Sequence, residues 1–325
     1  MTAWLLTWVW HGAALVAVVA VMLQLVPRLN AATRYAIWFG VLVAIAWPGW
    51  MSAAPAVDQP IYVPSAPDPA LTVFIGIWAA ISLLTLVRIV PSLHAIHSLR
   101  ARCRAFPSHL EARLPMWLEA RDRGRKTELK ICDAIPGATV LGFHRPCIAL
   151  PSALVDALTP TELDQIVLHE YAHVQRRDDW SRLAQALALC ALWIHPAAHA
   201  VSRALNRQRE MACDEWVVAR TGLPKAYAKC LAHAAEVRGQ LRGSPALLSA
   251  FLGTRHELVR RVDRLLTLHR RPRRSVSLPG LGAAIAAIMI VSMQLQSVRF
   301  AEIAEFVLPH VGAPMVRLAS ATVRL

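Results

Sequence analysis

The sequence predicts an α-helical membrane protein with four transmembrane helices and an inserted α+β domain. Three observations lead to this fold class. Apolar residues make up 56% of the 325 residues, the formal net charge is +14, and the charge is concentrated in one segment. Of the 35 Lys and Arg residues, 29 lie between residues 92 and 274. Apolar runs combined with one strongly basic segment are typical of a membrane protein whose Lys and Arg crowd one side of the bilayer.

Four apolar stretches are the expected transmembrane helices. Residues 3–26 contain no charged residue, and at 1.5 Å per residue they can cross a hydrocarbon core of about 30 Å. The other three stretches are residues 35–57, 71–90 and 275–298. The amino terminus reads MTAW and lacks the basic start of a secretory signal, so the first stretch is interpreted as a span.

The loops predict the orientation of these spans. The link between the first two spans carries Arg28 and Arg34, whereas residues 52–70 carry no Lys or Arg. The positive-inside rule therefore places the first link and residues 92–274 in the cytoplasm, and residues 299–325 outside as a short tail. A sequence pI near 10.5 would also suit nucleic-acid binding. Because topology accounts for the charge, no nucleic-acid partner is expected.

The inserted segment mixes helical and strand-like sequence. Residues 92–130 are charged and expected to be helical. The short pieces LKICD, ATVLGF and CIALP follow, bounded by Pro and Gly, and predict a small antiparallel sheet or hairpin. A helix is then expected over residues 160–177, with Thr159 or Thr161 as its cap and Pro160 in its first turn.

Six cysteines show neither a C-x-x-C pair nor a regular spacing. We expect them to be reduced and mostly buried thiols, because free Cys behaves as a small hydrophobic residue.

A histidine pair lies in the helix expected at residues 160–177. In VLHEYAHVQRRDDW, His169 and His173 are four residues apart and so share one helix face. That spacing lets two imidazoles bind one tetrahedral Zn²⁺, the H-E-x-x-H arrangement. Glu170 would act as general base on a water whose pKa zinc lowers towards about 7. The alternative is an amphipathic helix on which both histidines simply pack.

A third ligand is expected from a second helix at residues 204–220. Glu210 and Asp214 are four residues apart and share a face of that helix. Glu210 would complete a three-ligand zinc site whose fourth position stays open. Asp214 is expected behind the ligands, where a carboxylate orients a ligating histidine through its other ring nitrogen. The alternative for Glu210 is a solvated helix face.

Residues 183–201 carry no charge but are interrupted by His195, Pro196 and His199. A fifth span would put the two halves of the zinc site on opposite sides of the bilayer. A buried or membrane-grazing helical hairpin is therefore expected. His195 and His199 are interpreted as structural, because three protein donors already complete the site.

Together these motifs resemble the M56 family of integral-membrane zinc peptidases, of the BlaR/MecR type. The matching pieces are ATVLGFHRPCIALP, HEYAHVQRRDD, the WIHP turn and RQREMACDEWV, in that order between the third and fourth spans. The resemblance implies a gluzincin-like zinc peptidase domain over residues 92–274, with His169, His173 and Glu210 as ligands and Glu170 as base. It also implies that the LGFHRPCIALP strand is the sheet edge that pairs with an extended peptide.

The resemblance further implies a multi-pass protein of the bacterial-type inner membrane that acts in a signalling pathway. Its substrate would be a cytoplasmic protein: a transcriptional repressor, or the protease itself. A regulatory membrane or repressor partner and a homodimer stay open. Only residues 299–325 follow the fourth span, too few for a penicillin-binding sensor domain, and no S-x-x-K with its partner motifs is found. Direct β-lactam sensing by this chain is therefore not expected.

Two other functions remain open from the sequence. One is a membrane quality-control protease of the M48 type. The other is a non-catalytic transducer with a structural zinc site, against which Glu170 argues because a structural site needs no base. The group that would stabilise the oxyanion is not defined by any motif. Tyr227 and His233 are candidates by position alone.

Overall fold

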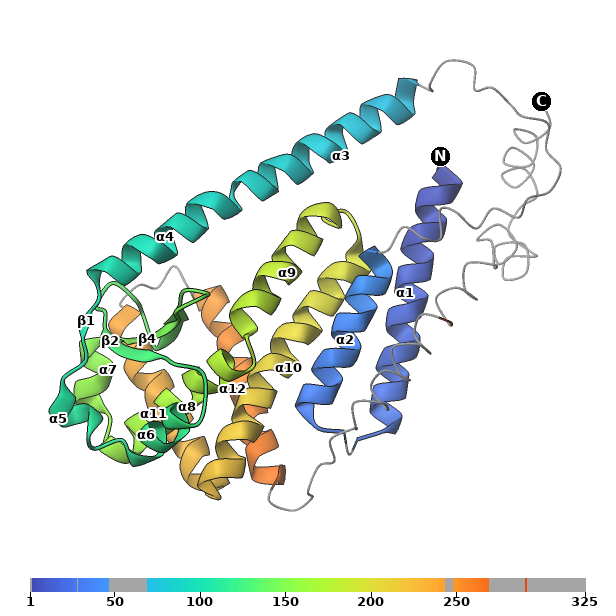
Figure 1. Ribbon diagram of the computed structural model, residues 1–325. Coiled ribbons are helices and arrows are strands. Elements are labelled where there is room, and N and C mark those ends of the chain that lie inside the picture. Colours follow the sequence, from blue (N-terminus) through green and yellow to red (C-terminus); the bar gives the residue numbers. More distant parts are fainter. Residues whose placement is uncertain (1, 28, 47–68, 243–247, 269–289, 291–325) are drawn as a thin grey trace, which may run out of the picture.

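The computed structural model describes residues 2–27, 29–46, 69–242, 248–268 and 290. It is mostly helical and has one small sheet (Figure 1). The helices are α1 (Thr2–Leu25), α2 (Ala31–Ala46), α3 (Pro69–Val87), α4 (Ile89–Arg102), α5 (Ser108–Glu111), α6 (Pro115–Asp122), α7 (Ser152–Ala157), α8 (Pro160–Gln175), α9 (Asp178–Ala191), α10 (Pro196–Thr221), α11 (Pro224–Arg242) and α12 (Leu248–Leu268). The strands are β1 (Arg104–Ala105), β2 (Glu128–Ile131), β3 (Thr139–Leu141) and β4 (Cys147–Leu150).

Among the described residues, two helical stretches are long and apolar enough to cross a membrane. By length and composition these are Trp8–Leu25 within α1 and Thr72–Arg102, which runs through α3 into α4. Figure 1 shows α3 and α4 as one long rod, so the helix predicted to end at residue 90 continues beyond it. The second expected span is described only as α2, which ends at Ala46. Residues 47–57 and, apart from residue 290, the fourth expected span lie outside the described residues.

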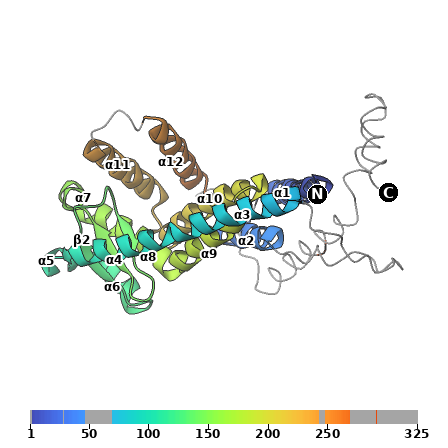
Figure 2. The ribbon, with the colours of Figure 1, turned by 90° about the horizontal axis from the view of Figure 1, so that it is seen from above.

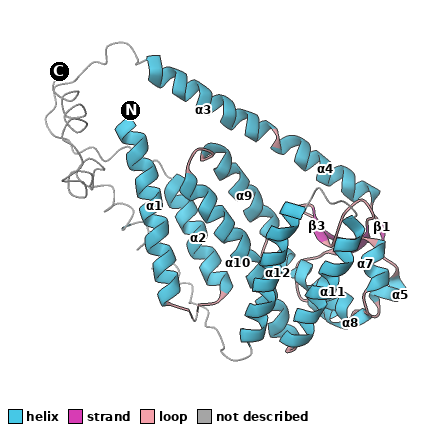
Figure 3. Cartoon of the chain, turned by 180° about the vertical axis from the view of Figure 1, so that it is seen from behind, coloured by secondary structure: helices cyan, strands magenta, loops and turns pink. Residues whose placement is uncertain are grey.

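The uncharged run at residues 183–201 forms the turn of a helical hairpin. α9 ends at Ala191 and α10 begins at Pro196, a residue that suits the first turn of a helix. The hairpin lies beside α1 and α2 (Figures 1 and 3), and one apolar cluster joins all four helices. Seen from above in Figure 2, the α3–α4 rod passes over α9 and α10, and Trp78 donates a hydrogen bond to the carbonyl of Ala191.

His195 and His199 make contacts within and beside this hairpin, in agreement with the structural role expected for them. His195 is fully buried, its ring meets that of Trp8 edge-on at 4.4 Å, and its Nε2 lies 3.3 Å from the Trp8 carbonyl oxygen. The Nε2 atom of His199 lies 2.7 Å from the Trp193 carbonyl oxygen. Both histidines therefore hold the turn rather than approach Glu210.

The sheet differs from the expected antiparallel arrangement. Its strand order is β1-β2-β4-β3, and β2 pairs with β4 in parallel, whereas β1–β2 and β3–β4 are antiparallel. α5 and α6 lie in the β1–β2 connection and the β3 strand lies in the β2–β4 connection, so β4 can enter in the same direction as β2. The strand β1 was not predicted, because the basic residues around it favour a continued helix.

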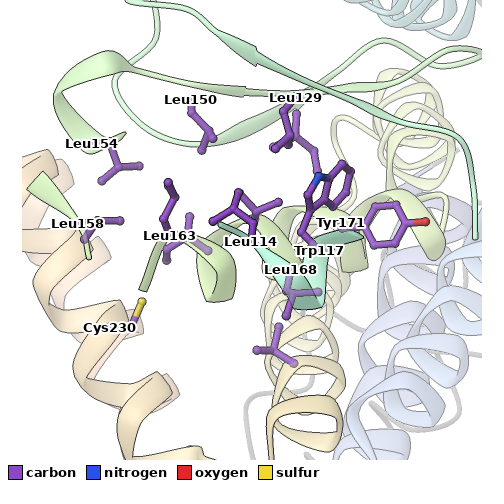
Figure 4. Close-up of a cluster of buried hydrophobic side chains, with 14 of the residues drawn as sticks. Leu114, Trp117, Leu129, Leu150, Leu154, Leu158, Leu163, Leu168, Tyr171 and Cys230 are labelled. Carbon is purple, nitrogen blue, oxygen red and sulfur yellow. The ribbon is translucent and has the colours of Figure 1, made fainter. Parts of the chain in front are cut away.

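The main core lies between the sheet and α6, α7, α8 and α11. Figure 4 shows leucines from β2, β4 and α7 facing Leu163, Leu168 and the rings of Trp117 and Tyr171. The Trp117 and Tyr171 rings are perpendicular, with centroids 5.1 Å apart, and both side chains are fully buried. Burying a side chain of this size stabilises the fold by about 1.5–3 kcal/mol. Helix α8 passes through this core, which fixes the position of the histidines that it carries.

A buried carboxylate joins α8 to α6. Asp164 is 4% exposed and accepts hydrogen bonds from the backbone N–H groups of Met116 (3.0 Å) and Trp117 (2.9 Å) in the first turn of α6. These amides have no partner within their own helix, so a side chain from elsewhere must satisfy them. Burial raises the pKa of Asp164, and the two amides oppose that rise.

We expect Asp164→Ala to lower the free energy of unfolding by about 2–4 kcal/mol, because two buried amides lose their acceptor. Asp164→Asn keeps one acceptor oxygen and should cost less. The measurement is thermal denaturation of the full chain in detergent, followed by circular dichroism. Asp156→Ala, at an exposed position of α7, is the matched control and should change stability by less than about 0.5 kcal/mol. Equal losses in the two alanine variants would contradict this role of Asp164.

Candidate metal centre

Helix α8 carries His169 and His173 on one buried face, at the place the sequence predicts. The helix begins with a capping box in which the Thr159 hydroxyl and the Glu162 carboxylate each accept a backbone N–H at the helix start. Of the two caps considered, Thr159 is the one used. The centroids of the two imidazole rings lie 5.0 Å apart. A four-residue spacing on a well-started helix thus brings both rings to the same point.

Helix α10 brings Glu210 to the same point. Its Oε2 lies 3.5 Å from His169 Nε2 and its Oε1 lies 3.7 Å from His173 Nε2. The three donor atoms all lie within 4.8 Å of one another. Tetrahedral zinc with bonds of about 2.0–2.1 Å separates its donors by roughly 3.3–3.5 Å. Two neutral imidazoles and a carboxylate at these distances fit a zinc ion with small adjustments.

A carboxylate that was not anticipated lies behind His173. Asp178 Oδ2 is 2.7 Å from His173 Nδ1, and Asp178 is 2% exposed. This contact places the proton on Nδ1 and leaves the Nε2 lone pair towards Glu210. α8 ends at Gln175 and α9 starts at Asp178 because Arg177 takes the left-handed conformation, with φ 55° and ψ 40°. The sequence gives little sign of a turn this tight, since a non-Gly residue rarely adopts positive φ.

Asp214 lies behind His169, as expected, together with Tyr227. Tyr227 donates to Asp214 Oδ1 at 2.8 Å, and its oxygen lies 2.9 Å from His169 Nδ1. Asp214 Oδ1 itself is 3.3 Å from the same nitrogen. The hydroxyl therefore relays the hydrogen bond from the imidazole to the carboxylate, and the ring is oriented with its Nε2 atom facing Glu210.

Arg261 of α12 balances the negative charge of this site and was also not anticipated. It binds Asp214 through Nη2 at 2.7 Å and Nε at 2.8 Å, and its Nη1 lies 3.5 Å from Glu210 Oε2. Its Nη2 lies 3.5 Å from His169 Nε2. No motif predicts this residue, because α12 is reached only through the packing of α11 and α12 against α8 and α10.

The residues around His169 favour the positively charged form of its ring. Burial lowers the pKa of His169, but Asp214 and Glu210 outweigh that effect and raise it to about 9. Burial alone would raise the pKa of Glu210 and that of Asp214. The histidines and Arg261 instead hold the pKa of each carboxyl well below its usual range. Both carboxylates therefore stay ionised at neutral pH, as a metal site requires.

A second group of donor atoms, His173, Asp178 and Cys213, lies on the far side of the His173 ring. The Cys213 sulfur is 3.3 Å from His173 Nδ1 and 3.7 Å from Asp178 Oδ2. Burial raises the pKa of the Cys213 thiol well above its usual value, which disfavours the thiolate form that would bind a metal. This group is better explained as support for His173. All six cysteines are free, as expected, and four are buried.

Glu170 and the three donors open into a cleft of about 950 Å³. One wall is β3 with the preceding residues Gly137 and Ala138, and the opposite wall is formed by α11 and α12. The strand at this edge differs from the one expected. β4 lies between β2 and β3 and is buried along its whole length, whereas β3 ends the sheet. The LGFHRPCIALP stretch is thus mostly the β3–β4 turn and an inner strand.

The two positional candidates for an oxyanion-stabilising group lie elsewhere. The Tyr227 hydroxyl is fully buried on the Nδ1 side of His169, away from the cleft donors. His233 Nδ1 lies 3.0 Å from Glu162 at the start of α8. Both residues were candidates by their position in the chain alone, and that position does not show which face of α11 points to the core. Arg261 is a cationic side chain that lines the cleft and contacts both donor helices.

An apolar helical bundle beside an open cleft with three metal donors and a neighbouring glutamate fits the class of membrane-associated metallopeptidases. A model of the family described as BlaR1 peptidase M56 matches residues 53–265, which is more than half of the chain. The chain therefore belongs to the M56 peptidase family, which confirms the resemblance inferred from its motifs. Among curated proteins, no match to the chain was found.

We expect Asp178→Asn to weaken zinc binding by roughly 10- to 100-fold, because the carboxylate that orients His173 is lost while the side-chain volume is kept. The measurement is the zinc dissociation constant of the full chain by competition with a chelator. Asp179→Asn is the matched control, because Asp179 pairs with Arg125 at 3.3 Å rather than with a histidine. Unchanged affinity in Asp178→Asn, or an equal loss in Asp179→Asn, would show that Asp178 does not orient a ligand.

Proposed function

We propose that this chain is a membrane-anchored zinc endopeptidase that cleaves a cytoplasmic protein in a signalling pathway. The observation that carries the proposal is the meeting of His169, His173 and Glu210 within zinc-donor distances, with Glu170 lining the same cleft. Three protein donors in an open cleft leave room for a reactant, whereas a structural zinc site is closed by four. This favours a catalytic site over a purely structural one.

His169, His173 and Glu210 would hold the zinc ion. When bound there, zinc would polarise the scissile carbonyl and make a water more acidic. Glu170 is adjacent in sequence to the first ligand and lines the cleft without taking part in the donor group. In this proposal its carboxylate accepts the proton of the attacking water and passes it to the leaving amine.

Arg261 would stabilise the negative charge that develops on the substrate carbonyl oxygen. Its guanidinium is fixed by two hydrogen bonds to Asp214 and still has N–H groups near Glu210 and His169. A cation held in this way needs no rearrangement during the reaction, which is the basis of electrostatic stabilisation in enzymes.

The peptide would bind along β3. Its inner edge pairs with β4, while Thr139 and Val140 line the cleft beside the zinc donors. An extended peptide that adds a strand here would gain main-chain hydrogen bonds and place one of its bonds beside Glu170. The cytoplasmic placement rests on the basic residues that crowd residues 92–274. A repressor and the protease itself are the substrates to be tested.

We expect Glu170→Gln to retain zinc but lose hydrolysis by about 100- to 10,000-fold, because the proton acceptor is removed without changing a ligand. Zinc content is measured on purified protein. Proteomes of cells that make wild type or Glu170→Gln are then compared for a cytoplasmic protein cleaved only by the former. Glu119→Gln, at an exposed position of α6, is the control and should cleave as wild type does. Unchanged cleavage in Glu170→Gln would refute the catalytic proposal.

We expect Arg261→Gln to lower kcat by about 100-fold with little change in KM or zinc content, since the charge on the transition state loses its partner. The assay is steady-state cleavage of the substrate found by the proteomic comparison. Arg260→Gln, one residue away and exposed, removes the same charge outside the cleft and serves as control. A loss of zinc in Arg261→Gln would instead assign Arg261 to holding the ligands.

A further inference from the structure

A second pocket, of about 460 Å³, lies on the other side of α9 from the metal centre. It is formed where α4, the β3–β4 turn and the first turns of α9 meet. Its walls are apolar: Leu93 and Ile96 come from α4, Leu183 from α9, and the rings of Phe143 and Trp180 close one side. The two rings meet edge-on at 5.4 Å. Among the described residues, none lines both this pocket and the cleft proposed for the substrate peptide, although α9 contributes different residues to each.

The polar groups of this pocket are basic. Arg100 and Arg145 line it together with His97 and His144, and none of its lining residues is acidic. Gly142 has φ +93°, and a Cβ there would lie 3.1 Å from Arg100 Nη1, so glycine both permits the turn and admits the guanidinium. In the part of the chain that the structure describes, no carboxylate pairs with Arg100 or Arg145. As far as the described residues go, the pocket therefore offers positive charge without a carboxylate partner beside apolar walls.

The pocket lies next to surfaces that suit hydrocarbon. α4 continues the apolar helix α3, whose first following charge is Arg88, and the rod runs obliquely to α1 and α2 in Figures 1 and 3. Leu93 and Trp180 at the pocket are 36% and 42% exposed. One turn further, Val90 on α4 is 65% exposed and Leu187 on α9 is 44% exposed. Exposed tryptophan and apolar residues next to arginines are typical of the membrane–water interface.

From this combination we infer that the pocket binds one anionic phospholipid. Its phosphate would lie between Arg100 and Arg145, and its acyl chains would follow the exposed apolar residues of α4 and α9. A basic pocket at the cytoplasmic end of membrane helices recognises lipids of this charge. A zwitterionic lipid would fill the same apolar walls but leave the two guanidinium groups without net compensation. The inference depends on membrane association and not on the proposed peptidase chemistry.

The test uses the full chain with a photo-reactive amino acid in place of Leu93. The protein is reconstituted into vesicles of phosphatidylcholine with phosphatidylglycerol, or of phosphatidylcholine alone, and the adducts are identified by mass spectrometry. We expect a phosphatidylglycerol adduct in the mixed vesicles. Arg100→Gln with Arg145→Gln should reduce it by roughly tenfold or more. Arg100→Lys with Arg145→Lys should largely restore it, which shows that the pocket is intact.

The matched control is Arg102→Gln with Arg113→Gln, which removes two charges from exposed positions outside the pocket and should leave the adduct unchanged. Equal adducts with both lipids would overturn the inference, as would an adduct that the Arg100 and Arg145 substitutions do not change. A crosslink from position 93 to another part of the same chain would also overturn it, because the pocket would then be filled by the protein itself.

Discussion

The meeting of α8 with α10 depends on the compensation of buried carboxylates. Asp178 and Asp214 are buried and Glu210 is partly buried at the cleft, and an uncompensated negative charge is unfavourable away from water. Each is matched: Asp178 by His173 and nearby arginines, Asp214 by Arg261, and Glu210 by both histidines and Arg261. The same groups that neutralise these charges also orient the imidazoles. Stability and metal-donor geometry are therefore set by one network.

The α9–α10 hairpin connects this network to the helices of apolar composition. The first half of α10 packs against α1 and α2, and its second half carries Glu210 and Asp214. Further contacts link α2 to the same region: the Tyr35 ring lies under the guanidinium groups of Arg176 and Arg209, and Glu215 accepts a hydrogen bond from the first N–H of α2. The proposed catalytic cleft and the proposed lipid pocket share the first turn of α9, where Asp178 supports His173 and Trp180 lines the pocket. The first turn of α9 therefore borders both the metal donors and the proposed lipid pocket.

The sequence predicts best those features that depend on residues close together in the chain. The helix expected at residues 160–177 depends on residues within a few positions of each other; it was predicted with Thr159 or Thr161 as its cap, and it runs from Pro160 to Gln175 with Thr159 as the cap. The sheet was expected to be antiparallel, but its pairing is set by α5 and α6 within the β1–β2 connection and by the later entry of β4. The edge of the sheet was assigned to the wrong strand for the same reason. The apolar run that becomes β4 is visible in the sequence, but the strands that pair with it are not.

The sequence by itself determined the apolar stretches, the basic inserted segment, the paired histidines and the family, because each is written in local spacing or composition. It also placed Glu210 and Asp214 on one helix face and Asp214 behind a histidine. Only the tertiary structure identified Asp178 and Arg261 as partners of the site, and it removed Tyr227 and His233 as oxyanion candidates. Asp178 depends on the left-handed turn at Arg177, and Arg261 itself lies 47 residues beyond Asp214 in the chain. Such partners are selected by the packing of whole helices, which no local pattern encodes.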